Sequence, residues 1–389
     1  MIDIKSNSSY SCKAEALELL KKIISFNTVN PPGNEKPLAG FFANYLKGSA
    51  DNVIVDDIAN NRSNVIAVVK GKGNKKSLVL NGHIDTVPFG DINAWHYSPT
   101  EAVIDGSRLY GRGASDMKSG LAAMLYAFKR LSVCNKQPEG DIIFIATADE
   151  ESYGAGAKNV LKKGVLENAG VIIIGEPTGN NMALASKGAI WLKFRIFGKA
   201  SHGAYPQEGI NAIDIAYELA GAIRKYVCGF AHRLLTEPTC TITEINGGTK
   251  VNMVPEGCEV SVDIRTVPAL DHESLFINID KTILELVGKY KGLEIVKEVL
   301  NNRFPVETKE EEPTVKMLFN ILREVTGKDP QLTGTSYFSD SSIFNIESHI
   351  PTVLFGPGSA DKAHKTDEYV DIEDFYMALQ CYERLIFDY

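Results

Sequence analysis

Five separate segments of this sequence carry histidine or carboxylate side chains next to a predicted buried strand or helix. Imidazole nitrogens together with carboxylate oxygens suit zinc best, with cobalt or manganese as alternatives. A single such residue is more often a turn former than a ligand, so the prediction of a metal site rests on the convergence of five. The segments are His83-Ile84-Asp85, Gly111 to Asp116, Asp149-Glu150-Glu151, Gly175-Glu176-Pro177-Thr178 and the stretch that reaches His364.

The spacing within two of these segments indicates different roles for neighbouring side chains. His83 and Asp85 are two positions apart, so in an extended chain both point to one face. Asp85 can then accept the second ring N–H of His83 and fix the tautomer that binds metal. Glu150 and Glu151 are adjacent in a loop after a strand, which predicts one carboxylate on the metal and the other free to take a proton from water.

The charge of the predicted site favours two metal ions over one. Asp116, Glu151 and Glu176 carry three negative charges that would repel one another in a confined, partly dry site. Two divalent cations and one hydroxide bring the sum to zero. A shared carboxylate would hold the ions about 3.5–4 Å apart, as in other two-metal hydrolases.

The elements that must position these residues are short apolar runs alternating with helical patterns. The runs are uninterrupted, which is typical of parallel strands covered on both faces. Because the carboxyl ends of such strands open on one crevice, residues far apart in sequence can meet there. The pattern predicts an α/β fold with a mostly parallel sheet. The predicted strands are 78–80, 142–145, 171–174 and 352–355, and the predicted helices 14–26, 119–131, 315–325 and 372–386.

The uninterrupted apolar runs give way to another pattern at about residue 189, and the first pattern returns after Pro305. Ile190, Leu192, Phe194 and Ile196 alternate with polar residues and Trp191, as in a half-exposed strand. The predicted elements from there to residue 299 follow the order β-α-β-β-α-β of a ferredoxin-like unit. We therefore expect a ferredoxin-like domain, residues 186–300, inserted into a catalytic domain formed by residues 1–185 and 301–389.

Composition excludes several classes of protein. The chain has 389 residues, 44% hydrophobic and 23% charged, which rules out disorder and predicts two domains. The net charge of −8 argues against nucleic acid or an anionic membrane as a partner. The sequence shows neither a signal-peptide pattern nor a long apolar span, so we expect a cytoplasmic protein. Six scattered cysteines favour reduced core thiols: Cys12, Cys134, Cys228, Cys240, Cys258 and Cys381.

At this point the sequence resembles a known family over nearly its whole length. It is similar to the zinc-dependent M20 metallopeptidases, and within them to the acetylornithine deacetylase and succinyl-diaminopimelate desuccinylase group. The matching motifs are specific only in combination. They are Gly82 to Pro88, Gly111-Arg112-Gly113, Ser115 to Gly120, Asp149-Glu150-Glu151, Gly175 to Thr178, Ser201-His202-Gly203, Asn252 to Pro255 and Ala363-His364.

The resemblance implies two Zn²⁺ per subunit, with Co²⁺ or Mn²⁺ as alternatives, and assigns their ligands. Asp116 corresponds to the carboxylate that bridges the two ions. His83 and Glu176 correspond to the remaining ligands of one ion. Glu151 and His364 correspond to those of the other.

The resemblance also implies the catalytic and substrate-binding groups. Glu150 matches the general base that acts on metal-activated water, and Asp85 matches the residue behind His83. The inserted domain corresponds to a dimerisation and lid domain, so a homodimer is expected. His202 matches a histidine that reaches the partner's site and stabilises the oxyanion. The implied substrate-binding residues are Arg265, Asn252 and Gly358.

The function implied is hydrolysis of the amide bond of an N-acyl amino acid, a small-molecule substrate. Desuccinylases carry an arginine pair shortly after the glutamate ligand, whereas this chain has Ser186-Lys187-Gly188, which is nearer to the deacetylase type. Residues 335–340 match neither subgroup. A dipeptidase or carboxypeptidase with the same chemistry is an alternative, as is a non-catalytic metal or peptide binder. The absence of G-x-G-x-x-G and G-x-S-x-G argues against a nucleotide-binding protein and a serine hydrolase.

Overall fold

The structure is a computed structural model that describes residues 4–132 and 137–389. These residues form two compact units. The first contains the described residues up to Leu184, then Thr308–Thr333 and Ser339–Tyr389, and the second contains Ala185–Glu307 and Gly334–Phe338. Cys134 lies outside the described residues. The five cysteines within them are free thiols, of which Cys240, Cys258 and Cys381 are buried.

The first unit is built on a mixed sheet with strands in the order β1-β2-β6-β3-β7-β15-β8. The predicted parallel arrangement holds in the centre, where β3 pairs in parallel with β6 and β7, and β7 with β15. The outer strands are antiparallel because β1 and β2 form a hairpin that pairs back onto β6. The strands are β1 (Asn52–Ala59), β2 (Arg62–Val69), β3 (Ser77–His83), β6 (Ile142–Thr147), β7 (Ala169–Ile174), β8 (Met182–Ser186) and β15 (Thr352–Leu354).

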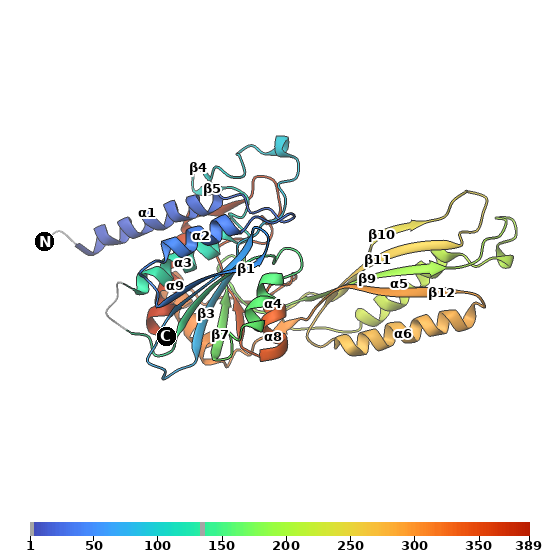
Figure 1. The fold of residues 1–389 in the computed structure, drawn as a ribbon. Coiled ribbons are helices and arrows are strands. Elements are labelled where there is room, and N and C mark those ends of the chain that lie inside the picture. Colours follow the sequence, from blue (N-terminus) through green and yellow to red (C-terminus); the bar gives the residue numbers. More distant parts are fainter. Residues whose placement is uncertain (1–3, 133–136) are drawn as a thin grey trace. The chain divides into compact units, whose positions relative to one another are not determined.

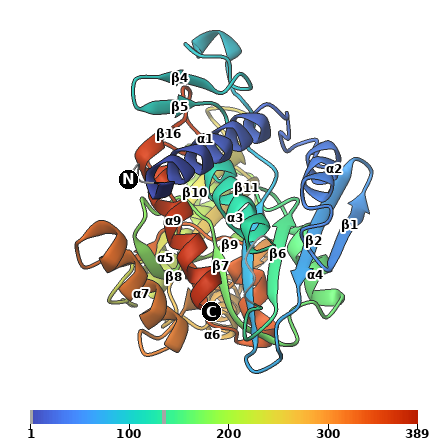
Figure 2. The same ribbon diagram turned by 90° about the vertical axis from the view of Figure 1, so that its left-hand side faces the viewer.

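Helices cover both faces of this sheet (Figure 1). On one face, the ring of Phe144 in β6 packs between Phe42 of α2 and Phe128 of α3, at 6.3 and 5.9 Å between ring centres. Figure 2 shows α1, α3 and α9 in front of the sheet on that side. The helices are α1 (Ile4–Ile24), α2 (Lys36–Tyr45), α3 (Lys118–Leu131), α4 (Ala155–Lys162), α7 (Pro313–Thr326), α8 (Ser341–Ser348) and α9 (Ile372–Asp388).

Short elements extend the large sheet and form a small one, and one of them, β13 (Val306–Glu307), belongs to the second unit. A small sheet has the strand order β16-β5-β4. Two further strands pair with β8 near the positions where the chain passes between the units. These elements are β4 (Val103–Asp105), β5 (Arg108–Tyr110), β13 (Val306–Glu307), β14 (Leu332–Thr335), β16 (Tyr369–Asp371) and the short helix η1 (Ile92–Ala94).

The second unit is an antiparallel sheet in the order β10-β11-β9-β12, with α5 and α6 on one face. The order of its elements is the predicted β-α-β-β-α-β, so the α/β class with an inserted ferredoxin-like unit is confirmed. Ile190, Leu192, Phe194 and Ile196 point into the core under the helices. The elements are β9 (Gly188–Phe197), η2 (Pro206–Glu208), α5 (Ala212–Val227), β10 (Thr239–Gly247), β11 (Gly257–Thr266), α6 (His272–Lys289) and β12 (Glu294–Arg303).

The second unit extends beyond the residues that the sequence assigned to it. Strand β12 continues to Arg303, and the chain returns to the first unit after Glu307. Residues 334–338 also pack with the second unit, although the sequence placed them in the catalytic domain. Within the ranges that the structure describes, we find no helix whose length and apolar character would let it span a membrane.

Helix α3 packs closely on the strand ends at Gly120, so a larger side chain at this position is expected to destabilise the fold. A Cβ added at Gly120 would lie 2.0 Å from the carbonyl oxygen of Gly175. We expect Gly120→Ala to lower the free energy of unfolding by about 1–3 kcal/mol, because the helix must move off the strand. Urea denaturation of the metal-free protein measures this change.

Gly40 in α2 is the matched control, because no atom lies within 4 Å of a Cβ added there. Gly40→Ala is expected to raise the free energy of unfolding by about 0.5–1 kcal/mol, since alanine favours the helix. Equal effects at the two glycines would show that the contact with Gly175 does not limit packing.

Candidate active site

His83 ends β3 and faces the loop that carries Asp116. The His83 Nε2 atom lies 3.1 Å from Asp116 Oδ1, and its Nδ1 atom lies 2.8 Å from the backbone carbonyl oxygen of Asp85. A carbonyl only accepts hydrogen bonds, so Nδ1 carries the proton and donates it. Nε2 is then the ring nitrogen that faces Asp116, where it donates to the carboxylate when protonated and is available to a metal ion when it is not.

The Asp116 carboxylate lies between two histidines. Its second oxygen, Oδ2, is 3.3 Å from His364 Nε2, and the same nitrogen is 3.2 Å from Glu151 Oε1. Ligand atoms of His83, Asp116 and Glu151 all lie within 4.8 Å of one another. Each oxygen of Asp116 therefore faces a different imidazole, as expected of a carboxylate shared by two ions.

Glu150 and Glu176 are buried beside this cluster, at 6% and 3% exposure. Burial raises the pKa of both carboxyl groups well above the usual value, and the charge of Asp116 adds to the effect at Glu176. Burial and the charge of Asp116 also raise the pKa of Glu151. Three carboxyl groups thus resist ionisation, first because they are buried and then because other carboxylates lie near them.

The two histidines respond in the opposite direction. Hydrogen bonds to Asp116 and Glu151 raise the pKa of His364 to about 10. Burial works against the charged form of His83, but the hydrogen bond to Asp116 and the charge of Glu150 raise its pKa well above the usual value. Protons on the two histidines thus supply positive charge next to the carboxylates. Two divalent cations would supply more of it. This donor set and its charge imbalance fit two metal ions.

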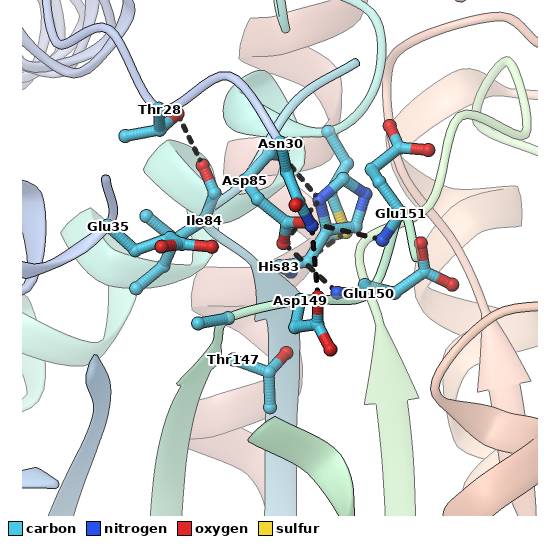
Figure 3. A network of polar contacts seen from close by, with 12 residues as sticks. Thr28, Asn30, Glu35, His83, Ile84, Asp85, Thr147, Asp149, Glu150 and Glu151 are labelled. Carbon is cyan, nitrogen blue, oxygen red and sulfur yellow. Dashed lines mark hydrogen bonds and ion pairs between the residues drawn. The ribbon is translucent and has the colours of Figure 1, made fainter. Parts of the chain in front are cut away.

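A network behind the cluster fixes the loop of Glu150 and Glu151 (Figure 3). The Asp85 carboxylate accepts hydrogen bonds from the backbone N–H groups of Glu150 and Glu151, at 3.1 and 3.2 Å. It is 3.9 Å from His83 Nδ1, whose hydrogen bond goes to the Asp85 carbonyl instead. The expected contact of Asp85 with His83 is therefore made by its backbone, and its side chain positions the two glutamates.

Asn30 and Arg62 tie this network together. The Asn30 amide donates to the carboxylates of Asp85 and Asp149, at 2.8 and 3.1 Å. Arg62 contacts Asp149 at 2.9 Å and the buried Glu35 at 2.6 Å. Asp149 has a φ of 72°, a left-handed conformation that turns the chain sharply just before Glu150.

The loop of Asp116 is held by a second buried pair. Glu368 accepts hydrogen bonds from the backbone N–H groups of Ser115 and Asp116, at 2.8 and 2.9 Å, and binds Arg112 at 2.6 Å. Sequence reasoning missed Glu368, Asn30 and Arg62. Arg112 lies in a motif singled out above, but Glu368 has no local pattern that links it to Asp116.

The predicted substrate-binding residues and the predicted oxyanion-stabilising His202 are divided between the two units. Gly358 lies in the first unit, and it packs so closely that an added Cβ would lie 2.1 Å from the Ser115 carbonyl oxygen. His202, Asn252 and Arg265 belong to the second unit. His202 and Asn252 are close together there, because Gly203 N–H donates to the Asn252 carbonyl. The guanidinium of Arg265 is already bonded to Asp263 through two nitrogens, at 2.8 and 3.0 Å.

Residues 79–388 match peptidase family M20/M25/M40, and the chain belongs to this family of amide-bond hydrolases. The predicted family and enzyme class are thereby confirmed. A probable succinyl-diaminopimelate desuccinylase of Staphylococcus aureus (strain MRSA252) is 29% identical over 402 residues, 93% of this chain and 94% of the relative. An acetylornithine deacetylase of Vibrio cholerae is 29% identical over 376 residues, and the match covers 92% of this chain and 94% of the relative. A solved M20 metallo-carboxypeptidase from Sulfolobus solfataricus has a TM-score of 0.75 at 22% identity, covering 96% of this chain and 98% of its own.

Proposed function

We propose that this protein is a two-metal amidohydrolase that cleaves the amide bond of N-acyl amino acids, as a deacetylase or desuccinylase does. The observation that carries the proposal is the Asp116 carboxylate placed between His83 and His364. The names of the curated relatives support this substrate class. The name of the Sulfolobus structure supports the alternative, a carboxypeptidase with the same chemistry.

The five proposed ligands divide into two sets that share Asp116. His83 and Glu176 would complete one site, and Glu151 and His364 the other. Divalent ions bound there would polarise the scissile carbonyl group and lower the pKa of water. Zinc is the proposed metal, because imidazole and carboxylate ligands suit it.

Glu150 is the proposed general base. Its backbone is fixed by Asp85, and its buried carboxyl group has a raised pKa, which suits a group that must both accept and release a proton. Glu150 would take a proton from the attacking water and give it to the leaving amine nitrogen. This retention of a base next to a proposed ligand argues against a mere metal-binding role.

His202 is the proposed oxyanion-binding residue. Its Nδ1 accepts a hydrogen bond from the backbone N–H of Ala204, at 3.1 Å. In the neutral ring the proton is therefore on Nε2, which is exposed and can donate to the oxygen that becomes negative.

Metal binding is the first test. We expect two zinc ions per chain after loading, because two ions balance the buried carboxylates. Asp116→Ala should lose both ions and His364→Ala about one, as measured by elemental analysis after gel filtration. The exposed His96 provides the control, since His96→Ala should keep both. A zinc content near zero in the loaded wild type would contradict the site.

Loss of the proposed base is the second test. Glu150→Gln should reduce turnover of an N-acetyl amino acid by at least about two orders of magnitude, because general acid–base catalysis contributes roughly 10²–10⁴ in rate. Both metal ions should remain bound. Glu139→Gln is the control, because Glu139 precedes β6 whereas Glu150 follows it, so Glu139 is at the opposite end of that strand. Near-normal turnover of Glu150→Gln would remove Glu150 from the mechanism.

The second unit is also proposed to form a homodimer, which His202 would need in order to reach a partner's site. Several apolar side chains of this unit are open to solvent, including Phe197 at 48% and Leu284 at 71% exposure. Sedimentation velocity at micromolar concentration should give twice the chain mass of 42.6 kDa. A strictly monomeric and active enzyme would exclude the dimer and any role of His202 across subunits.

A further inference from the structure

The helix-free face of the second unit's sheet carries two cross-strand rows of functional side chains. In the first row, Asp263 of β11 is opposite Trp191 of β9, which is opposite Asn301 of β12. Directly opposed residues on neighbouring strands share a face. The neighbouring residue Ile190 points into the core under the helices, so this row projects to the other side.

The second row holds two arginines, and the small side chain of an alanine lies between them in the sheet. Arg265 is opposite Ala189, which is opposite Arg303. Phe338 fills the space between the two arginines. Its ring centre lies 5.6 Å from Arg265 Cζ and 5.4 Å from Arg303 Cζ, and 6.2 Å from the ring of Trp191.

Arg265 has its counter-ion within the first row. Its Nε and Nη2 atoms bind the two oxygens of Asp263, and Asp263 Oδ2 also accepts from Trp191 Nε1 at 2.8 Å. Further along the same face, Arg195 is paired with Glu259 and Glu298. Each of these two arginines is thus paired with at least one carboxylate.

Arg303 differs from these cations. It is only 3% exposed, and neither Nη1 nor Nη2 has a hydrogen-bond partner among the residues that the structure describes. The buried Nδ2 of Asn301, two positions before it, likewise has none within the described ranges. Three buried donors, two of them on a cation, thus lack an acceptor, which is costly without a compensating negative charge.

We propose that Arg303 and Asn301 form a carboxylate-binding site that Phe338 covers. A carboxylate offers only acceptors, and its two oxygens match the paired nitrogens of a guanidinium. The Phe338 ring must move aside for the ligand to reach these nitrogens. The carboxylate belongs either to the substrate or to a separate small acid. The first source rests on the proposed function, whereas binding itself does not.

The fluorescence of Trp191 can report binding at this site, because the chain has only two tryptophans and the other can be replaced. In a Trp95→Phe background we expect propionate, at constant ionic strength, to change the Trp191 fluorescence saturably. The neutral isostere propionamide should not do so. Arg303→Met should weaken the propionate response at least about tenfold, as the loss of a charge-assisted hydrogen bond predicts, and Arg303→Lys should weaken it less.

Two further variants make the binding test specific. Arg195→Met removes a paired arginine from the same face and should leave the response unchanged. Phe338→Ala keeps Arg303 and opens the site, so it should lower the Kd for propionate several-fold. The proposal is overturned if propionate gives no more response than propionamide, if phosphate alone binds, or if Arg303→Met and Phe338→Ala both bind like the parent.

Kinetics with an N-acetyl amino acid and its C-terminal amide separate the two sources of the carboxylate. If the substrate supplies it, Arg303→Met should reduce the acid-over-amide preference in kcat/KM at least about tenfold, while both metals stay bound. If a separate acid supplies it, the preference persists although propionate binding is lost. Failure of the proposed hydrolysis is recognised independently, because wild type would then turn over neither compound.

Discussion

Four carboxyl groups gather in one place in the first unit, the buried ones of Glu150 and Glu176 and the partly buried ones of Asp116 and Glu151. Electrostatic repulsion between like charges grows as water is excluded, so these groups cannot all be ionised without added positive charge. The raised pKa of the three glutamates and the raised pKa of His83 and His364 are two sides of this imbalance. The metal ions proposed for this site would relieve the imbalance.

The residues behind the cluster have partners within the chain. Asp85 and Asp149 share the Asn30 amide, and Arg62 is paired with both Asp149 and Glu35. Backbone N–H groups use the remaining acceptors of Asp85. A hydrogen-bonded outer layer thus holds in place the loop that carries the inner carboxylates of Glu150 and Glu151.

The fold class and the residues at the strand ends were predictable because they depend on local patterns. The apolar run before His83 marks a buried strand, and adjacent Glu150 and Glu151 mark a loop with two acids. The supporting partners were not predictable, since Asn30, Arg62 and Glu368 reach their carboxylates and backbone groups from distant positions. Arg265 stays a predicted substrate anchor, and the structure adds that two nitrogens of its guanidinium are bonded to Asp263.

The membership of residues 334–338 in the second unit changes how this protein can be divided. The chain passes between the two units at four positions, not at the two that a simple insertion requires. A fragment cut at the ends of 185–307 would contain every strand of the ferredoxin-like sheet but would lack Phe338, the ring that packs against Trp191 and Arg303. Exchange of this domain between relatives, by recombination or by engineering, would therefore have to carry a second, non-contiguous piece of sequence.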